Sequence, residues 1–300
     1  MRKLLTLVGA LVAAMAVAAT PASAITGNFL PDNEHPFVGL VVFYDASGNF
    51  MWRCSGSLLT PTVMLTAGHC TDQNAAESPA FARIYFAQDA GALFTPENGM
   101  DPKTGYPVTC LPQPDPCVTS HQLYDFGFDN FAGFPNIHDV GLLILDQPVH
   151  LSEYGALAAP GSLDSLATQR GRQNVTFTVS GYGVSRTLQN NPSKTISFRS
   201  RLMAETKLVN LNSALAGGFN IQLSSAPANG RGGTCFGDSG GPVFYGGFSS
   251  NVIVAVNSFV LNGNCAGVGF GFRVDSAAVQ AWIESIIGPA EFAKINIVQL

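Results

Sequence analysis

The sequence GDSGGP at residues 237–242 places a serine beside small residues, an arrangement that suits a nucleophile. Glycines next to Ser239 would let backbone N–H groups approach a reacting carbonyl, as acyl-transfer chemistry requires. The same residues also match the G-x-S-x-G motif of α/β-hydrolases. In that class the catalytic histidine follows the serine, and no histidine occurs between Ser239 and Leu300. A histidine that activates Ser239 must therefore precede it in the chain.

Five histidines precede Ser239, and their surroundings differ. His69 stands in LTAGHC, directly before Cys70, and is the candidate base. His138 adjoins Asp139, which opens the apolar segment VGLLIL. A carboxylate beside a buried strand needs a partner, so Asp139 is the candidate acid. We interpret the other three histidines as structural or surface residues: His35, His121 and His150.

Four segments resemble the trypsin/chymotrypsin family of serine proteases: CSGSLLTPTVMLTAGHC, HDVGLLILDQPV, GYG and CFGDSGGP. They occur in the order His, Asp, Ser, and the resemblance covers nearly all of residues 25–288. The resemblance implies that Ser239 is the nucleophile, His69 its general base and Asp139 the acid that orients the imidazole. It also implies an oxyanion hole formed by the backbone N–H groups of Gly237 and Ser239.

The resemblance further implies a substrate pocket formed by Gly233, Ser258, Phe259, Val260 and Gly269. Ser258 would lie beside the buried aspartate of the site. Trypsin-like relatives have an aspartate at the position of Gly233, which pairs with a Lys or Arg side chain, and glycine cannot do this. Val260 narrows the pocket where many relatives have glycine. We therefore expect a serine endopeptidase whose protein or peptide substrates are cleaved after small or medium uncharged residues, such as Ala, Val or Leu.

Two other classes of protein are alternatives to a trypsin-like serine endopeptidase. A catalytically silent binding protein on the same scaffold is the alternative, which a covalent serine-directed inhibitor would distinguish. The subtilisin class fits poorly, because it requires the order Asp, His, Ser and an α/β chain.

Residues 1–24 are typical of a secretory signal peptide. Two basic residues precede an apolar run at 4–19, and Ala22-Ser23-Ala24 provides small residues for the peptidase. The run is shorter than the roughly 18 residues of a membrane span, and Pro21 interrupts the segment. We therefore expect a secreted, extracellular protein that has no membrane association after cleavage. The net charge of −5 gives no reason to expect nucleic acid as a partner, and we expect a monomer.

Cleavage after Ala24 would make Ile25 the first residue of the mature chain. In the resembled family, a new N-terminal Ile or Val folds inward after activation. Its ammonium group pairs with the aspartate before the nucleophile, which is Asp238 here. ITGN at residues 25–28 differs from the usual IVGG at its second and fourth residues. The resemblance nevertheless implies that removal of the signal peptide itself creates an Ile25–Asp238 activation pair.

Six cysteines in a chain expected to be secreted favour disulfides, although their spacing alone does not choose among the possible pairings. The resemblance implies Cys54–Cys70 near His69 and Cys235–Cys265 near the pocket. Cys110 and Cys117 have no family counterpart, and we expect them to pair within an insertion at 87–136. A zinc site is the competing interpretation. The sequence has no C-x-x-C or H-x-x-x-H pair, so we expect neither a metal nor a cofactor.

Short runs rich in Val, Ile, Phe and Thr alternate with turn residues along the chain, which is typical of an all-β fold. The clearest runs are at 37–44, 63–67, 140–145, 175–183 and 252–260. An amphipathic helix is expected at 276–287, because one face carries Val279, Trp282, Ile283 and Ile286, and Gly288-Pro289 ends it.

Together with the resemblance, these patterns predict two packed six-stranded antiparallel β-barrels of the chymotrypsin-like type with a C-terminal α-helix. The predicted division is a signal peptide at 1–24, a peptidase domain at 25–288 and a tail at 289–300. Within the domain, barrel one is expected at about 25–160, barrel two at about 161–275 and the helix at about 276–287.

Overall fold

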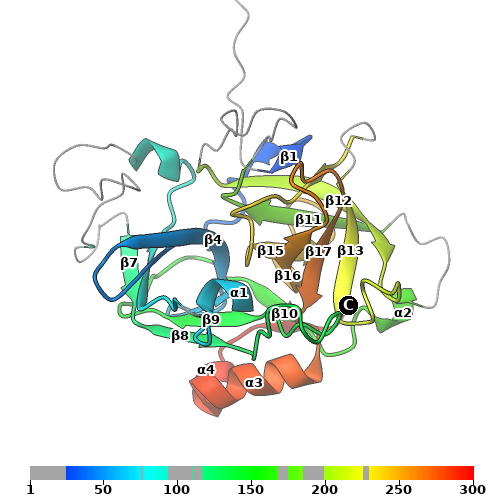
Figure 1. Ribbon diagram of the computed structural model, residues 1–300. Helices are drawn as coiled ribbons and strands as arrows, with labels where there is room; N and C mark the ends of the chain where they lie inside the picture. The colour runs from blue at the N-terminus through cyan, green and yellow to red at the C-terminus, as the bar shows by residue number, and fades with distance from the viewer. Residues whose placement is uncertain are drawn as a thin grey trace, which may run out of the picture.

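The structure is a computed structural model that describes residues 25–75, 77–93, 110, 117–167, 175–184, 199–225 and 230–300. The predicted signal peptide lies outside these residues, as does much of the predicted insertion. Two β-barrels stand next to each other, and a C-terminal helix packs across one end of the pair (Figure 1). The larger hydrophobic core includes residues of both barrels and of this helix.

The first barrel is formed by antiparallel strands in the order β7-β6-β3-β4-β5-β9-β8. A single residue, His121, separates β7 from β8, so these two strands act as halves of one strand that closes the ring. The barrel therefore has six strand positions. The bounds are β3 (Val38–Tyr44), β4 (Phe50–Leu58), β5 (Val63–Thr66), β6 (Phe81–Tyr85), β7 (Cys117–Ser120), β8 (Gln122–Asp125) and β9 (Gly141–Ile144).

The second barrel closes completely. Its strands follow the order β15-β11-β12-β13-β17-β16, and β15 also pairs with β16. The predicted fold class, two six-stranded antiparallel barrels with a C-terminal helix, is thereby confirmed. The bounds are β11 (Thr176–Gly181), β12 (Leu202–Asn210), β13 (Asn220–Ser225), β15 (Pro242–Tyr245), β16 (Val252–Val260) and β17 (Gly267–Arg273).

The segment that follows Ala24 is attached to the second barrel. Strand β1 (Thr26–Gly27) pairs antiparallel with β14 (Gly232–Gly233), and β2 (Leu30–Pro31) pairs with β12. Ile25 is fully buried in the apolar cluster of the second barrel. This part of the chain is therefore built into the fold.

The C-terminal helix α3 (Ala277–Ile287) buries Val279 and Ile283 against the core, as its sequence pattern predicts. Gly288 ends it with a positive φ of 79°, a conformation that favours glycine. The chain continues through α4 (Pro289–Phe292) to β18 (Ile297–Val298), which pairs parallel with β10 (Ala156–Ala158). The tail at 289–300, for which the sequence predicted no structure, thus extends the sheet of the second barrel. None of the described helices is long and apolar enough to span a membrane.

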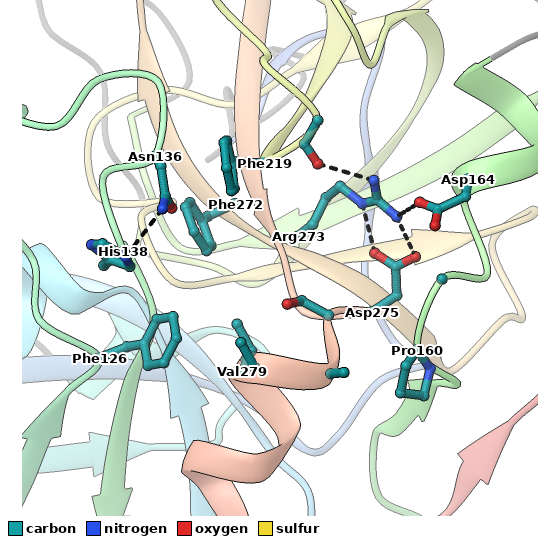
Figure 2. A pocket seen from close by; sticks show the side chains of 15 residues that line it. Phe126, Asn136, His138, Pro160, Asp164, Phe219, Phe272, Arg273, Asp275 and Val279 are labelled. Atoms are coloured by element: carbon teal, nitrogen blue, oxygen red, sulfur yellow. Dashed lines mark hydrogen bonds and ion pairs between the residues drawn. The ribbon is translucent and has the colours of Figure 1, made fainter.

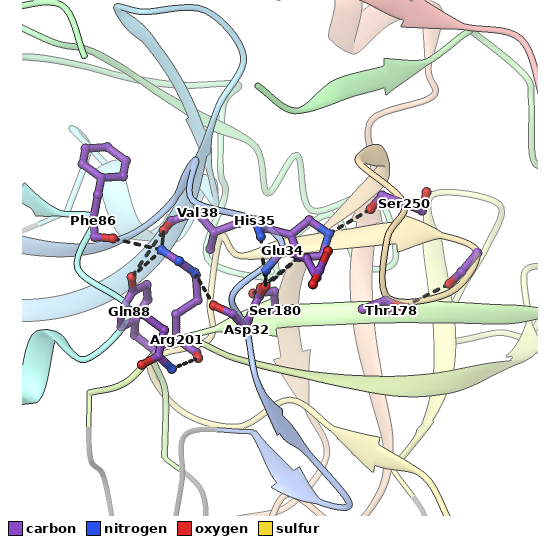
Figure 3. A network of polar contacts seen from close by, with 12 residues as sticks. Asp32, Glu34, His35, Val38, Phe86, Gln88, Thr178, Ser180, Arg201 and Ser250 are labelled. Atoms are coloured by element: carbon purple, nitrogen blue, oxygen red, sulfur yellow. Dashed lines mark hydrogen bonds and ion pairs between the residues drawn. The ribbon is translucent and has the colours of Figure 1, made fainter. Parts of the chain in front are cut away.

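A buried polar network joins the N-terminal segment to both barrels (Figure 3). The fully buried Asp32 accepts hydrogen bonds from the hydroxyl of Ser180 in β11 (2.5 Å) and contacts Nδ1 of His35 (2.9 Å). The guanidinium group of Arg201 donates to the carbonyls of Asp32 and of Val38 in β3 (3.0 and 3.1 Å). His35, which we interpreted as structural, is only 1% exposed and belongs to this network.

Candidate active site

His69 is carried by a four-residue helix between the barrels, α1 (Gly68–Thr71). The disulfide Cys54–Cys70 ties this helix to β4, and the indole Nε1 of Trp52 donates to the carbonyl of Cys70 (3.0 Å). Gly68 must be small, because a Cβ there would lie 3.0 Å from the backbone N of Val140. The helix is therefore held closely against the segment that carries Asp139.

Asp139 is completely buried and receives donors from both barrels. Nδ1 of His69 lies 2.9 Å from its Oδ2 and 3.0 Å from its Oδ1, and the backbone N–H of His69 donates to Oδ1 (2.8 Å). The hydroxyl of Ser258 in β16 donates to Oδ2. The preceding His138 has a positive φ of 52°, which turns the backbone sharply where Asp139 enters the site.

Burial and mutual attraction act in opposite directions on this pair. Burial disfavours the charged form of each group and is the largest single influence on each pKa, but the charge attraction and the hydrogen bonds together outweigh it. The pKa of His69 is therefore raised above its ordinary value, with Asp72 adding to the effect. The pKa of Asp139 is lowered, and the hydrogen bond from Ser258 contributes to this. Asp139 thus carries the negative charge that favours an imidazolium at His69.

Ser239 lies in a tight turn that only glycines allow. Gly237 and Gly240 have positive φ values of 94° and 78°, and a Cβ at Gly240 would lie 2.1 Å from Oγ1 of Thr66. The carbonyl of Ser239 accepts a hydrogen bond from the backbone N–H of Ser55 (2.8 Å). Ser239 and His69 line the same cavity, which has a volume of about 450 Å³.

The carbonyls around Ser239 are directed to partners inside the protein. That of Gly237 accepts from the hydroxyl of Ser55 (2.9 Å), and that of Phe236 accepts from the N–H of Val184 (2.7 Å). Among the described residues, no hydrogen bond is made by the N–H of Gly237 or of Ser239. The oxyanion hole of Gly237 and Ser239 stays a prediction.

Three of the five predicted pocket residues, Ser258, Phe259 and Val260, line the active-site cavity. Gly233 and Gly269 are not among the described residues that line it. A Cβ at position 233 would lie 1.8 Å from Oγ of Ser225, and one at position 269 would lie 3.0 Å from Oγ1 of Thr234, which does line the cavity.

Ser225, Thr234 and Asn257 lie at or near the cavity, and no sequence motif predicted them as site residues. Thr234 and Asn257 line the cavity, and they directly follow Gly233 and directly precede Ser258 in the sequence. Their proximity to predicted residues could have identified them. Ser225 comes from β13, whose pairing with β17 brings it near Gly269.

Asp238 is fully buried beside the nucleophile turn. Its carboxylate accepts hydrogen bonds from the backbone N–H groups of Gly183 (2.8 Å) and Cys235 (2.9 Å). Burial nevertheless raises its pKa to about 7, although these donors and the charge of Arg53 lower it. Thr26, the residue after Ile25, pairs with Gly233, two residues before Cys235. The nitrogen of Ile25 is a peptide nitrogen while residue 24 is attached, so its ion pair with Asp238 stays a prediction.

Two further disulfides are present: Cys235–Cys265, of which Cys235 lines the cavity, and Cys110–Cys117, which joins residue 110 to the start of β7. Among the described residues, the one cluster of potential metal ligands is Cys54, His69 and Cys70. The sulfurs of this cluster are joined in the first disulfide, so it offers no free thiolate for a metal.

A second cavity of about 490 Å³ lies behind the Asp139 segment, between Asn136, His138 and the start of α3 (Figure 2). Arg273 is held there by Asp275 (2.7 Å) and Asp164 (2.6 Å). Burial opposes its charge, but these carboxylates raise the pKa of Arg273 above its ordinary value. Its charge is thus satisfied within the protein.

The fold and the order of these site residues define a chymotrypsin-like serine protease scaffold. The family model described as Trypsin matches residues 118–283, which is more than half of the chain. The chain therefore belongs to the trypsin family.

Individual relatives are distant. Serine protease 7 of Drosophila melanogaster is 28% identical over 239 residues, which cover 74% of this chain and 54% of that protein. The thrombin-like enzyme flavoxobin of Protobothrops flavoviridis is 32% identical over 138 residues, covering 45% of this chain and 42% of the enzyme. The chain spans about half or less of the length of these curated relatives.

Solved structures share the fold at low identity. HL collagenase has a TM-score of 0.58 at 18% identity, covering 88% of this chain and 98% of that chain. The scabies mite inactivated protease paralogue S-D1 has a TM-score of 0.57 at 14% identity, covering 88% and 97%. A mutant of human heparin binding protein has a TM-score of 0.56 at 18% identity, covering 88% and 96%. The scaffold therefore occurs in three kinds of protein: one named as a collagenase, one named as an inactivated protease and one named as a heparin binding protein.

Proposed function

We propose that this protein is a secreted serine endopeptidase that hydrolyses peptide bonds through an acyl-enzyme intermediate. The observation that carries the proposal is the pair between the buried Asp139 and His69, because His69 lines the same cavity as Ser239. The side chain of His69 is 28% exposed, so a substrate can reach the imidazole while the carboxylate behind it stays protected from water.

Each of the three side chains has a distinct role in this mechanism. His69 Nε2 takes the proton of the Ser239 hydroxyl as the oxygen attacks the scissile carbonyl. Asp139 holds Nδ1 of His69, which fixes the tautomer and stabilises the imidazolium that forms. The imidazolium then gives its proton to the leaving amine, and water hydrolyses the acyl group on Ser239 in a second step. Ser258 keeps Asp139 oriented through its hydroxyl.

The N–H groups of Gly237 and Ser239 would bind the oxyanion that develops on the substrate carbonyl. Each such donor contributes about 3 kcal/mol to transition-state stabilisation. The positive φ of Gly237 is the local conformation that supports this role.

We propose small or medium uncharged side chains at the position before the cleaved bond. Gly233 offers no carboxylate to a Lys or Arg side chain, and Val260 narrows the cavity that Phe259 also lines. The substrates would be proteins or peptides.

The mature protein in this proposal is a monomer that begins at Ile25, after removal of residues 1–24. It comprises the peptidase domain at 25–288, with the barrels divided near residue 160, and the tail at 289–300. The free ammonium group of Ile25 would pair with Asp238 and order the oxyanion hole.

The alternative function is protein binding without catalysis, which the names of two structural neighbours make a specific candidate. A fluorophosphonate probe distinguishes the two, because it reacts with an activated serine. We expect the secreted protein to be labelled at Ser239 and to hydrolyse peptides. Ser239→Ala and His69→Ala should abolish both, with a nearly unchanged thermal transition. Absence of labelling in folded, processed wild-type protein would favour the binding function.

A further inference from the structure

Asn257 carries an unpaired donor at the active-site cavity. The residue is 3% exposed, and it lines the cavity that contains His69 and Ser239. Its side-chain Nδ2 is buried and has no hydrogen-bond partner among the described residues. A buried donor without a partner is unfavourable in a folded protein, so this nitrogen indicates a partner that the free protein does not supply.

The backbone of Asn257 is fixed against the nucleophile turn. Its N–H donates to the carbonyl of Gly241 (2.8 Å), and its carbonyl accepts from the N–H of Gly240 (2.7 Å). The pairing of β16 with β17 shifts register between Asn257 and Phe259, and the next side chain, Ser258, reaches Asp139. Asn257 and Ser258 both line the cavity, so Asn257 is held at the proposed substrate site.

Four other buried polar side-chain atoms in the described part of the chain are also unpaired, but their residues do not line this cavity: Tyr44, Ser57, Asp129 and Asn220. Asn257 differs from them because it lines the cavity that contains His69 and Ser239. Of the described residues with an unpaired buried polar atom, Asn257 is thus the one that lines the proposed substrate site.

Hydroxyl groups make the same region polar. Thr234 lines the cavity, and its Oγ1 lies 3.0 Å from the place that a Cβ would occupy at Gly269. Oγ of Ser225 lies 3.7 Å from that same place and 1.8 Å from the corresponding place at Gly233. A cavity that served only aliphatic side chains would not need these hydroxyls beside the two predicted pocket glycines.

The charges around the cavity disfavour an anionic side chain. Among the described residues that line it, the ionisable ones are His69 and Asp72, and none of these lining residues is a lysine or arginine that could pair with a carboxylate. Position 233 is a glycine, so the predicted pocket floor has no anion for a cation, and the described carboxylate of the cavity is that of Asp72, three residues from His69. A neutral group is therefore the complement of the region around Asn257.

Resting on the proposed function, we propose that Asn257 is a specificity-determining residue that selects substrates with a neutral, oxygen-bearing side chain before the cleaved bond, namely Ser, Thr, Asn or Gln. The amide Nδ2 donates to the side-chain oxygen, and Thr234 offers a second polar contact. A site with a buried hydrogen-bonding group discriminates strongly against analogues that lack the partner.

Matched peptides test the proposal on the secreted, processed protein. Internally quenched peptides of one sequence would differ only at the residue before the cleaved bond, in the pairs Thr/Val, Asn/Leu, Gln/Met and Gln/Glu. The decisive pair is the one that contains the fastest of all these peptides. Within it, we expect the peptide with Thr, Asn or Gln to have a kcat/KM at least about tenfold higher than that of its partner peptide. Equal or faster cleavage of the apolar member would overturn the proposal, as would faster cleavage of Glu than of Gln.

Two variants assign the discrimination to the amide. Asn257→Leu removes the donor at similar volume, and Asn257→Asp keeps the shape but replaces N–H by a carboxylate oxygen. Either should reduce the tenfold ratio to about threefold or less. Asn220→Leu is the matched control, because Asn220 is also fully buried and has an unpaired side-chain oxygen outside the cavity. The control should keep the wild-type ratio.

Labelling at Ser239 tests the protease function separately from the role of Asn257. A wild-type protein that is labelled and cleaves peptides, but discriminates equally well without Asn257, contradicts only the role of Asn257. A folded, processed protein that is neither labelled nor active rejects the protease function and this inference together.

Discussion

The carboxylate of Asp139 connects the two barrels at the level of single atoms. It binds the ring and backbone N–H of His69 from the first barrel and the hydroxyl of Ser258 from the second. Because both of its oxygens have donors, it stays ionised despite complete burial. The charge at His69 therefore depends on the relative placement of both barrels.

The pH dependence of hydrolysis follows from this pair. Protonated His69 cannot accept the proton of Ser239, so kcat/KM should rise with pH through a midpoint above about 6.5, because Asp139 raises the pKa of His69. In Asp139→Asn the midpoint should fall and kcat should drop by about 10⁴-fold. Asp146→Asn breaks the exposed pair with His121 and should leave the profile unchanged. A wild-type midpoint below that of Asp139→Asn would contradict the assignment.

Asp238 gives the unprocessed chain a distinct pH-dependent stability. Burial raises its pKa from 3.8 to about 7, so the folded state binds a proton that the unfolded state releases. The free energy of unfolding should therefore fall as the pH rises from about 4 to about 7. A chain that begins at Ile25 should lack this decline, because its ammonium group would keep the carboxylate ionised. Urea unfolding across this pH range, in a Ser239→Ala background, compares the two forms.

Peptide hydrolysis provides a second test of the proposed pair between Ile25 and Asp238. A chain that begins at Ile25 should be active, whereas one that begins Met-Ile25 should fold but be largely inactive. Asp238→Asn in the chain that begins at Ile25 should resemble the extended form. Full activity of the extended form would show that the oxyanion hole is ordered without the Ile25 ammonium group.

At the scale of elements, apolar runs were predictable and polar strands were not. The runs at 63–67 and 252–260 correspond to β5 and β16, and the helix at 276–287 corresponds to α3. The strand β4 contains Arg53 and two serines, and its pairing with β3 and β5 stabilises it in spite of this composition. The positions of His69, Asp139 and Ser239 followed from motifs. The place of Ser225 depends on strand pairing, which no local pattern encodes.

The buried Asp32 network connects the N-terminal segment with β11 and β3, and its contribution to stability depends on pH. Burial opposes ionisation of Asp32, but His35, Ser180 and Arg201 lower its pKa below 3.8. Its contribution is therefore present above about pH 4 and lost as the pH falls through the lowered pKa. Asp32→Asn should reduce the free energy of unfolding by about 3 kcal/mol at neutral pH. Chemical unfolding at pH 7 and at pH 3 should show a smaller effect at the lower pH.

The exposed pair between Asp146 and His121 provides the comparison for Asp32. Its side chains are 32% and 64% exposed, so Asp146→Asn should change the free energy of unfolding by less than about 1 kcal/mol. A comparable loss in both variants would show that burial of the Asp32 network adds nothing to its strength.

At the scale of the whole molecule, the proposed catalytic residues belong to both halves of the chain. His69 and Asp139 come from the first barrel, and Ser239 and Ser258 come from the second. The same scaffold occurs in relatives that differ widely in sequence, because its strand pairing does not require particular site residues. Membership of the family therefore describes the scaffold, and the activity has to be measured on this chain.

The guanidinium group of Arg201 has a consequence for cooperativity. It is 3% exposed and donates to the carbonyls of Val38 and Phe86 and to the hydroxyl of Tyr182. Separating the barrels would remove its two acceptors in the first barrel, the carbonyls of Val38 and Phe86, so neither barrel can unfold alone at low free energy. We expect a single calorimetric transition whose calorimetric and van't Hoff enthalpies agree. Arg201→Met should divide it into two transitions, whereas Arg231→Met, which breaks only a pair with Glu205, should not.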